Sequence, residues 1–409
     1  DNRYFIIGSE YIIFNGANYN ITIKDKENYE GLINNGDFTE NGFSNVTVKN
    51  VNIKSANSTL SGGSGWIGQS NYSKGAINNI IDNCTSDGDL TGNFDSGGIV
   101  GSYSGSEFGN LTIKNCSSSG NNYSYDAGGI AGWRSASNGY LKIDRCFSTG
   151  DILGYRNGGL VANGCAEYDG TVEINESFTT GDISGWNCHG LVASSFGGNS
   201  RINSSGGLFI SNCYTLGNVK GSYKYNEEQL KGLSTFLLEN NLPCSGFLGQ
   251  PAFLTDGLDN ILTDDNGNEI YYNNIYISNV YVAGKIEGKD SYAIVPPSIE
   301  DKLPFYNFTY AANGKWNNCL ANKKLDPRFL PNKNNDNLWI DINKSSDNVP
   351  YRLSTFNDFV YYFNKNNYNL NDKILVNNKF NMTIYDTEFN KDNRYFIIGS
   401  EYIIFNGAN

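Results

Sequence analysis

The chain has 409 residues, of which 39% are hydrophobic and 14% aromatic, and it contains 47 glycines. Its 42 acidic and 30 basic residues give a formal net charge of −12, which argues against nucleic acid and anionic membrane surfaces as partners. No apolar run approaches the ~20 residues that span a bilayer, so we expect no membrane insertion. Abundant glycine and aromatic residues favour many short strands joined by turns over long helices.

The first eighteen residues return at the other end of the chain. Residues 1–18 read DNRYFIIGSEYIIFNGAN and recur unchanged at residues 392–409, an offset of 392 − 1 = 391 residues. We interpret the chain as one 391-residue repeat followed by the start of the next, in a head-to-tail array of the same protein. An artificial overlap of the two ends would read the same, but the duplicated piece is apolar and β-prone, unlike a tag.

A shorter repeat of about 30 to 34 residues runs inside this unit. Its first marker is a glycine-rich apolar segment: Gly65-Trp66-Ile67-Gly68, Gly98-Ile99-Val100-Gly101, Gly129-Ile130-Ala131-Gly132, Gly159-Leu160-Val161-Ala162 and Gly190-Leu191-Val192-Ala193. A second marker keeps step with it: Ile81-Asp82-Asn83-Cys84, Ile113-Lys114-Asn115-Cys116, Ile143-Asp144-Arg145-Cys146, Ile174-Asn175-Glu176-Ser177 and Ile210-Ser211-Asn212-Cys213. A third follows, as in Thr149-Gly150-Asp151-Ile152 and Thr180-Gly181-Asp182-Ile183.

Three short strands per unit, each bounded by Gly, Asn or Asp, suit a chain that turns corners and adds one rung per unit to parallel sheets. The sequence therefore predicts an all-β, right-handed parallel β-helix, or β-solenoid. Identical positions would stack ~4.8 Å apart along the axis. No single unit buries its own apolar face, so we expect the units to fold together.

These markers resemble the GLUG repeat of large bacterial and viral surface proteins, over about residues 31–290. The segments Leu338-Trp339-Ile340-Asp341 and Val349-Pro350-Tyr351-Arg352-Leu353 resemble the closing part of that family's frame. Ser354-Thr355-Phe356-Asn357-Asp358-Phe359 resembles the short helix that opens a new solenoid, and Phe14-Asn15-Gly16-Ala17-Asn18-Tyr19-Asn20-Ile21 resembles its first strand. The resemblance implies a surface location and a fibre or adhesin role.

The predicted organisation has four parts. Residues 1–296 are the parallel β-helix, interrupted by an insertion at 226–275 that holds a helix at 227–240 and a loop at 263–268. Residues 297–351 are an irregular connector packed on the solenoid. Residues 352–391 carry a short helix at 354–366 and strands leading into the next repeat, which begins at 392–409.

Half of the eight cysteines share one repeat position. Cys84, Cys116, Cys146 and Cys213 occupy it, Ser177 fills it in one unit, and Val51 and Val280 fill it in outer units. Ser and Val as substitutes indicate a small buried site, so we predict a structural thiol ladder. Disulfides are the alternative, whereas a single row of thiolates cannot surround a tetrahedral metal ion. Cys165, Cys188, Cys244 and Cys319 lie outside the ladder, and their pairing is left open.

An aromatic residue follows the third marker at similar spacing in several units: Phe94, Tyr155, Trp186 and Tyr223. Stacked rings at a corner can grip the faces of sugars, so the row is a candidate site for host or matrix glycans. A ladder of rings that stabilises only the solenoid is the alternative.

No catalytic constellation stands out. His189 is the only histidine and takes a position otherwise held by glycine, which favours a structural role. Glu107, Arg134, Glu167 and Asp169 are acids and a base of the kind that carbohydrate-acting enzymes use, but they share no repeat position. Asp264-Asp265-Asn266-Gly267-Asn268-Glu269 has oxygen ligands but no complete Ca²⁺ loop.

We therefore expect a non-enzymatic protein without metal or cofactor, the structural repeat unit of a long, adhesive extracellular or virion-surface fibre. A polysaccharide-acting β-helix enzyme and a spike that binds a glycan or receptor are the alternatives.

Overall fold

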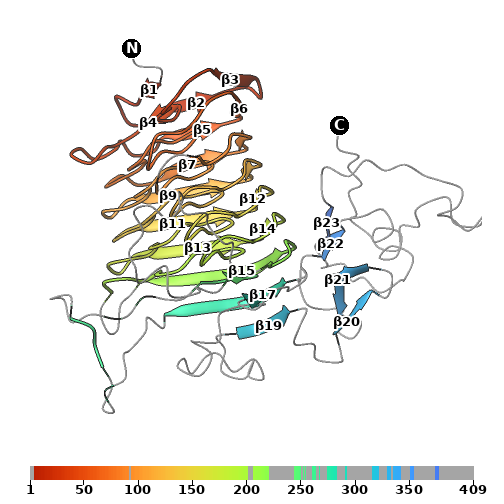
Figure 1. Cartoon of the computed structure of the whole chain (residues 1–409). Coiled ribbons are helices and arrows are strands. Elements are labelled where there is room, and N and C mark those ends of the chain that lie inside the picture. Colours follow the sequence, from red (N-terminus) through yellow and green to blue (C-terminus); the bar gives the residue numbers. More distant parts are fainter. Residues whose placement is uncertain are drawn as a thin grey trace, which may run out of the picture. The chain divides into compact units, whose positions relative to one another are not determined.

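The solenoid is the part of the chain that the structure describes most completely. A computed structural model describes residues 4–91, 94–200, 206–220 and 244–249, and shorter stretches at 252, 254, 260–263, 267, 274–282, 291–292, 316–321, 329–332, 335–341, 351–353 and 374–376. Within these residues the fold is a β-solenoid of about 6 turns with parallel sheets and no helix, which confirms the predicted all-β class. Figure 1 shows the turns stacked in chain order from β2 to β17.

One face of each turn carries a strand that pairs in parallel with the strands of the neighbouring turns. In order these are β2 (Ile13–Asn15), β5 (Thr47–Lys49), β7 (Asn79–Asp82), β9 (Asn110–Lys114), β11 (Tyr140–Asp144), β13 (Thr171–Asn175), β15 (Gly207–Thr215) and β17 (Ile275–Val282).

A second face begins after a sharp corner. Its strands are β3 (Asn20–Lys24), β6 (Asn52–Ala56), β8 (Thr85–Ser86), β10 (Ser117–Ser118), β12 (Phe147–Ser148) and β14 (Phe178–Thr179), after which β15 and β17 run across both faces. On the side that closes the turn, β1 (Phe5–Ile6) pairs with β4 (Ile33–Asn34), and single bridges then continue the row from Ile33 through Gly68, Val100, Ala131, Val161 and Val192 to Leu248.

The remaining strands are short. β16 (Cys244–Ser245) pairs in parallel with β18 (Ser291–Tyr292), and β19 spans Trp316–Ala321. β20 (Phe329–Asn332) and β21 (Asn335–Asp341) are antiparallel, whereas β22 (Tyr351–Leu353) and β23 (Ile374–Val376) are parallel. The chain divides into two compact units, Asp1–Cys319 and Leu320–Asn409.

Residues 244–249 return to the solenoid inside the range predicted as an insertion. Ser245 bridges His189, and Leu248 bridges Val192, which lies one turn earlier. Gly246-Phe247-Leu248-Gly249 is thus a further copy of the glycine marker, which the sequence analysis did not recognise. The predicted helices at 227–240 and 354–366, most of the loop at 263–268, and residues 392–409 lie outside the described residues.

The core is a set of apolar ladders. Alternation along each first-face strand directs every second side chain inward, so isoleucine stacks on isoleucine. One such ladder runs through seven buried residues: Val48, Ile81, Ile113, Ile143, Ile174, Ile210 and Ile277. A second lies two residues earlier: Leu111, Leu141, Val172, Leu208 and Ile275. Burial of these ladders, at ~25 cal/mol per Å² of apolar surface, holds the turns together.

A serine or threonine of the second face crosses this core to the glycine marker. Ser86 Oγ donates to the carbonyl oxygen of Gly98 at 2.6 Å, and Thr179 Oγ1 donates to that of Gly190 at 2.7 Å. The glycine has no room for a side chain, because a Cβ on Gly98 would lie 2.0 Å from the carbonyl oxygen of Gly129. The second face and the side that closes the turn, where the glycine marker lies, are therefore coupled through space, which explains why their sequence markers stay in phase.

The corner between the first two faces uses the left-handed backbone region. Asn50, Asn83 and Asn115 have φ of 56°, 52° and 54° there, and asparagine tolerates this conformation. The amide side chains bond along the row, with Asn83 Nδ2 donating to Asn50 Oδ1 at 2.8 Å. Arg145 and Glu176 take the same conformation in later turns, at φ 53° and 50°, where it is costly for their side chains.

Replacing Glu176 by Asn should stabilise the solenoid, because asparagine relieves the cost of the left-handed corner. We expect Glu176→Asn to raise the free energy of unfolding by roughly 0.5–1 kcal/mol, measured by urea denaturation. Glu176→Gln is the control, since it removes the charge but keeps the backbone cost. Equal effects of the two variants would contradict the prediction.

Candidate functional site

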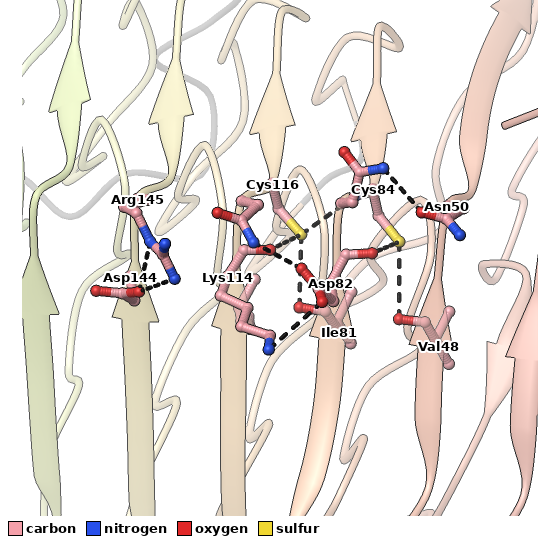
Figure 2. Close-up of polar contacts among 12 residues, drawn as sticks. Val48, Asn50, Ile81, Asp82, Cys84, Lys114, Cys116, Asp144 and Arg145 are labelled. Carbon is pink, nitrogen blue, oxygen red and sulfur yellow. Dashed lines mark hydrogen bonds and ion pairs between the residues drawn. The ribbon is translucent and has the colours of Figure 1, made fainter. Parts of the chain in front are cut away.

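The cysteine position forms a buried ladder at the start of the second face. Figure 2 shows Cys84 and Cys116 side by side in neighbouring turns. Cys116 Sγ lies 3.1 Å from the carbonyl oxygen of Lys114 and accepts a bond from the Cys84 N–H at 3.4 Å. Ser177 reproduces this pattern, because its hydroxyl donates to the carbonyl of Asn175 at 2.8 Å and accepts from the Cys146 N–H at 3.0 Å. The ladder therefore satisfies backbone groups inside the core.

All seven cysteines whose side chains are described are buried and form no disulfide. Cys188 and Cys244 lie outside the ladder in one apolar cluster with Ile152, Ile183 and Val219. Burial raises the pKa of the Cys188 thiol well above its ordinary value, so it stays protonated and unreactive. Cys319 lies outside the described side chains.

The aromatic row is continuous and includes one ring that the sequence analysis missed. Phe94, Tyr125, Tyr155 and Trp186 follow one another in successive turns, with ring centroids 5.4, 5.7 and 5.8 Å apart. Tyr155 and Trp186 are only 5% and 6% exposed, whereas Phe94 is 55% exposed. A sugar has little access to the two inner rings, so the geometry favours the stabilising ladder over a glycan platform. Tyr223 lies outside the described residues.

A row of polar residues follows the rings by one position. Asp95, Asp126, Arg156 and Asn187 occupy this position with φ of 69°, 52°, 51° and 55°. Arg156 Nη2 donates to Asp126 Oδ2 at 2.6 Å, and its guanidinium carbon lies 4.9 Å from the centroid of the Tyr155 ring. Each of these residues stands two positions before the residue that opens the glycine corner of its turn, which is Gly97, Gly128, Gly158 or His189. This spacing would have identified the row from the sequence.

Two of the predicted acid and base candidates meet beside this row. Arg134 Nε lies 2.8 Å from Glu167 Oε2, an ion pair rather than a linear hydrogen bond. Arg134 also donates to the hydroxyl of Tyr103 at 3.2 Å, and its guanidinium carbon lies 4.3 Å from the centroid of the Trp133 ring. Glu107 and Asp169, the other two candidates, lie on exposed turns and do not join the pair.

Three carboxyl groups of this cluster hold their protons unusually tightly. Burial raises the pKa of Asp126 to about 6, although Arg156 and Arg134 oppose the shift. Burial and the neighbouring Asp126 raise the pKa of Asp95 to about 6. Burial raises the pKa of Glu167 to about 7 against the effect of Arg134. We call Asp95, Asp126, Arg134, Arg156 and Glu167 the acid–arginine cluster.

The acid–arginine cluster has the groups for proton transfer, since its carboxyls titrate near neutral pH. Glu167 and Asp126 are however only 5% and 6% exposed, and each already has an arginine partner. Removing one partner of a buried ion pair leaves an unpaired buried charge, which destabilises the folded state. The arrangement therefore serves to link neighbouring turns, from Asp126 to Arg156 and from Arg134 to Glu167.

His189 is fully buried at the first position of the glycine corner, where Gly158 stands one turn earlier. Its Nδ1 lies 2.8 Å from Ser245 Oγ, and its Nε2 lies 2.9 Å from Asn187 Oδ1 and 3.0 Å from Ser194 Oγ. Burial lowers its pKa to about 3, so the ring stays neutral. With both nitrogens bonded inside the core, the histidine has a structural role.

Among the described residues, no three histidine, cysteine, aspartate or glutamate side chains gather as metal ligands would. No helix in the described part of the chain has the length and apolar character to cross a membrane.

The fold thus defines the chain as a β-solenoid repeat protein. Comparisons with protein-family models, curated proteins and solved structures found no match. The resemblance to the GLUG repeat accordingly rests on the three periodic markers of the sequence, such as Gly98-Ile99-Val100-Gly101.

The raised pKa of Asp126 predicts a pH-dependent contribution to stability. Between the ordinary value of 3.8 and about 6, the folded chain binds the proton more tightly than the unfolded chain, so this contribution is lost as pH rises. His189 changes the stability in the opposite direction. Between about pH 3 and ~6.5 its ring is protonated in the unfolded chain but not in the folded chain, so its contribution to stability increases as pH rises. The effect of Asp126 is therefore isolated by comparing the melting temperature of the wild-type protein with that of a variant at this position.

We expect the melting temperature of the wild-type protein to fall relative to that of Asp126→Asn as pH is raised from 4 to 7. Asp169→Asn, on an exposed turn, is the matched control. A pH-independent difference between wild type and Asp126→Asn would show that the carboxyl is not perturbed.

Cys116→Ser should fold with the same β-rich circular dichroism spectrum, because Ser177 already fills this position in a later turn. We expect a loss of at most about 2 kcal/mol in the free energy of unfolding. Cys116→Asp is the contrasting variant, since it buries a charge. Failure of Cys116→Ser to fold under oxidising but not reducing conditions would reveal a disulfide.

Proposed function

We propose that the chain is the structural repeat unit of a long fibre on a cell or virion surface. The observation that carries this proposal is the unchanged return of residues 1–18 at residues 392–409 in a chain that folds as a solenoid. A solenoid grows by adding turns to its end, so a sequence that repeats head to tail has a direct way to become a continuous filament.

The physical support is that the turns depend on their neighbours. Each turn of about 31 residues buries its ladders only between the turn before and the turn after it. An end turn leaves unpaired strand edges and half-covered apolar side chains, which is a liability for a free monomer. A second repeat placed on that end removes the liability without a dedicated cap.

The enzymatic alternative has less support. Of its three candidate acids, Glu167 is buried and paired with Arg134, and the exposed Glu107 and Asp169 do not join that pair. A glycan-binding spike would need open ring faces, whereas Tyr155 and Trp186 are buried in their ladder. The surface location and the adhesive role rest on the resemblance to GLUG surface proteins.

Proteins of one, two and four repeats should show a rising melting temperature, because every added repeat covers an open end. In electron micrographs their length should grow by a constant increment. Single repeats at equal mass concentration are the control for concentration effects. Beads on flexible strings, with one repeat as stable as four, would overturn the proposed fibre.

A further inference from the structure

Between the glycine marker and the next first-face strand, the chain passes a corner in the left-handed backbone region. Backbone hydrogen bonds align Asn71, Tyr103, Arg134 and Gly164 at this corner in successive turns, with φ of 59°, 55°, 52° and 71°. Asparagine and glycine tolerate this conformation, whereas it is costly for tyrosine and arginine. Small residues therefore satisfy the fold here, and Tyr103 and Arg134 are bulkier than the corner requires.

A second corner, a few residues later, shows the same contrast. Glu107, Asn138, Tyr168 and Asn199 occupy it in successive turns, with φ of 52°, 50°, 51° and 55°. Asparagine fits this backbone, but tyrosine does not, and Tyr168 is 47% exposed. The stability of the solenoid does not explain an exposed ring in a costly conformation. Conformations of this kind cluster at functional sites.

The bulky residues of the two corners meet. Arg134 Nη1 donates to the Tyr103 hydroxyl at 3.2 Å, and Arg134 Nε lies 2.8 Å from Glu167 Oε2. Burial lowers the pKa of the Arg134 guanidinium, but Glu167, Tyr103 and Tyr168 together raise it above its ordinary value, so Tyr168 is a near neighbour. The guanidinium carbon lies 4.3 Å from the centroid of the Trp133 ring. We call these five residues the corner cluster.

The corner cluster reaches the surface of the solenoid. The Arg134 side chain is 30% exposed, and Tyr103 and Trp133 are half-buried. Asp169, which follows the exposed Tyr168, is exposed as well. The surface therefore combines an open aromatic ring with the N–H and O–H donors of arginine and tyrosine and the acceptor oxygens of a carboxylate.

This combination of groups indicates the chemical class of the ligand. An anion is disfavoured, because Glu167 already neutralises Arg134 and the chain carries a net charge of −12. A cation would use acceptors alone, whereas the corner cluster also presents the donors of Arg134 and Tyr103. A neutral sugar has hydroxyl groups that both donate and accept, and the apolar face of its ring can stack on an aromatic ring.

We propose that the corner cluster binds a neutral glycan, with one sugar ring stacked on Tyr168 and its hydroxyl groups bonded to Arg134 and Asp169. This inference rests on the adhesive part of the proposed function and names its site and its ligand class. The site is distinct from the aromatic row of the earlier turns, whose inner rings are buried. Binding explains why a bulky residue stands at each corner where asparagine or glycine fits the backbone better.

Binding of the 409-residue chain to an array of neutral and acidic oligosaccharides tests the site. We expect the chain to bind neutral oligosaccharides, and Tyr168→Asn to weaken the affinity for the strongest of them roughly tenfold or more. The variant should melt at or above the wild-type temperature, because Asn138 fills this corner one turn earlier. Arg134→Lys keeps a charge beside Glu167 but loses the guanidinium fork, so it should also weaken binding.

Glu107→Asn is the matched control, because it relieves the same backbone cost two turns before Tyr168. It should raise the melting temperature and leave sugar binding unchanged. Equal binding by wild type and Tyr168→Asn, binding confined to acidic oligosaccharides, or no binding to the array would overturn the site and leave the proposed fibre standing. Sugar binding that persists while linked repeats form beads on flexible strings would overturn the fibre and leave the site standing.

Discussion

Parallel hydrogen bonding between successive turns is the interaction on which the rest of this structure depends. It places each residue beside its counterpart about 31 residues away, so every side chain must fit a copy of its own position. Isoleucine stacks on isoleucine in the core, and the rings of Phe147, Phe178 and Tyr214 stack with centroids 4.9 Å apart. A side chain that fits a given position in one turn is therefore of a size that fits the same position in other turns. The Cys116 position accordingly holds serine or valine elsewhere in the solenoid.

The narrow interior sets the second constraint. At Gly98 the next turn approaches so closely that a Cβ has no room, and the hydroxyl of Ser86 reaches the same corner from the opposite face. A buried hydroxyl is tolerated because it is hydrogen-bonded, and a buried glycine carbonyl is satisfied in return. The interior thus combines apolar ladders with a polar row, which fixes the relative position of the faces in each turn.

The turns are additive, because each one contributes the same ladders and backbone hydrogen bonds to its neighbours. The acid–arginine cluster adds local links between turns, with Arg156 bonded to Asp126 and Arg134 paired with Glu167. Burial keeps the pKa values of these carboxyls high, so the links are formed at some cost in desolvation. In the first turn, Phe5, Ile6, Ile13 and Tyr19 are each more than half exposed, and under the proposed function a neighbouring repeat would cover them.

The sequence by itself determined the fold class, the phase of the turns and the buried cysteine position, because a side chain that stacks on its own copy leaves a periodic signal. Tertiary structure alone decided which non-periodic residues meet. Arg134 and Glu167 stand at different repeat positions, yet coiling brings them together. The return of Gly246-Phe247-Leu248-Gly249 to the register of Val192 was likewise hidden, because the intervening residues displace it along the chain without displacing it in space.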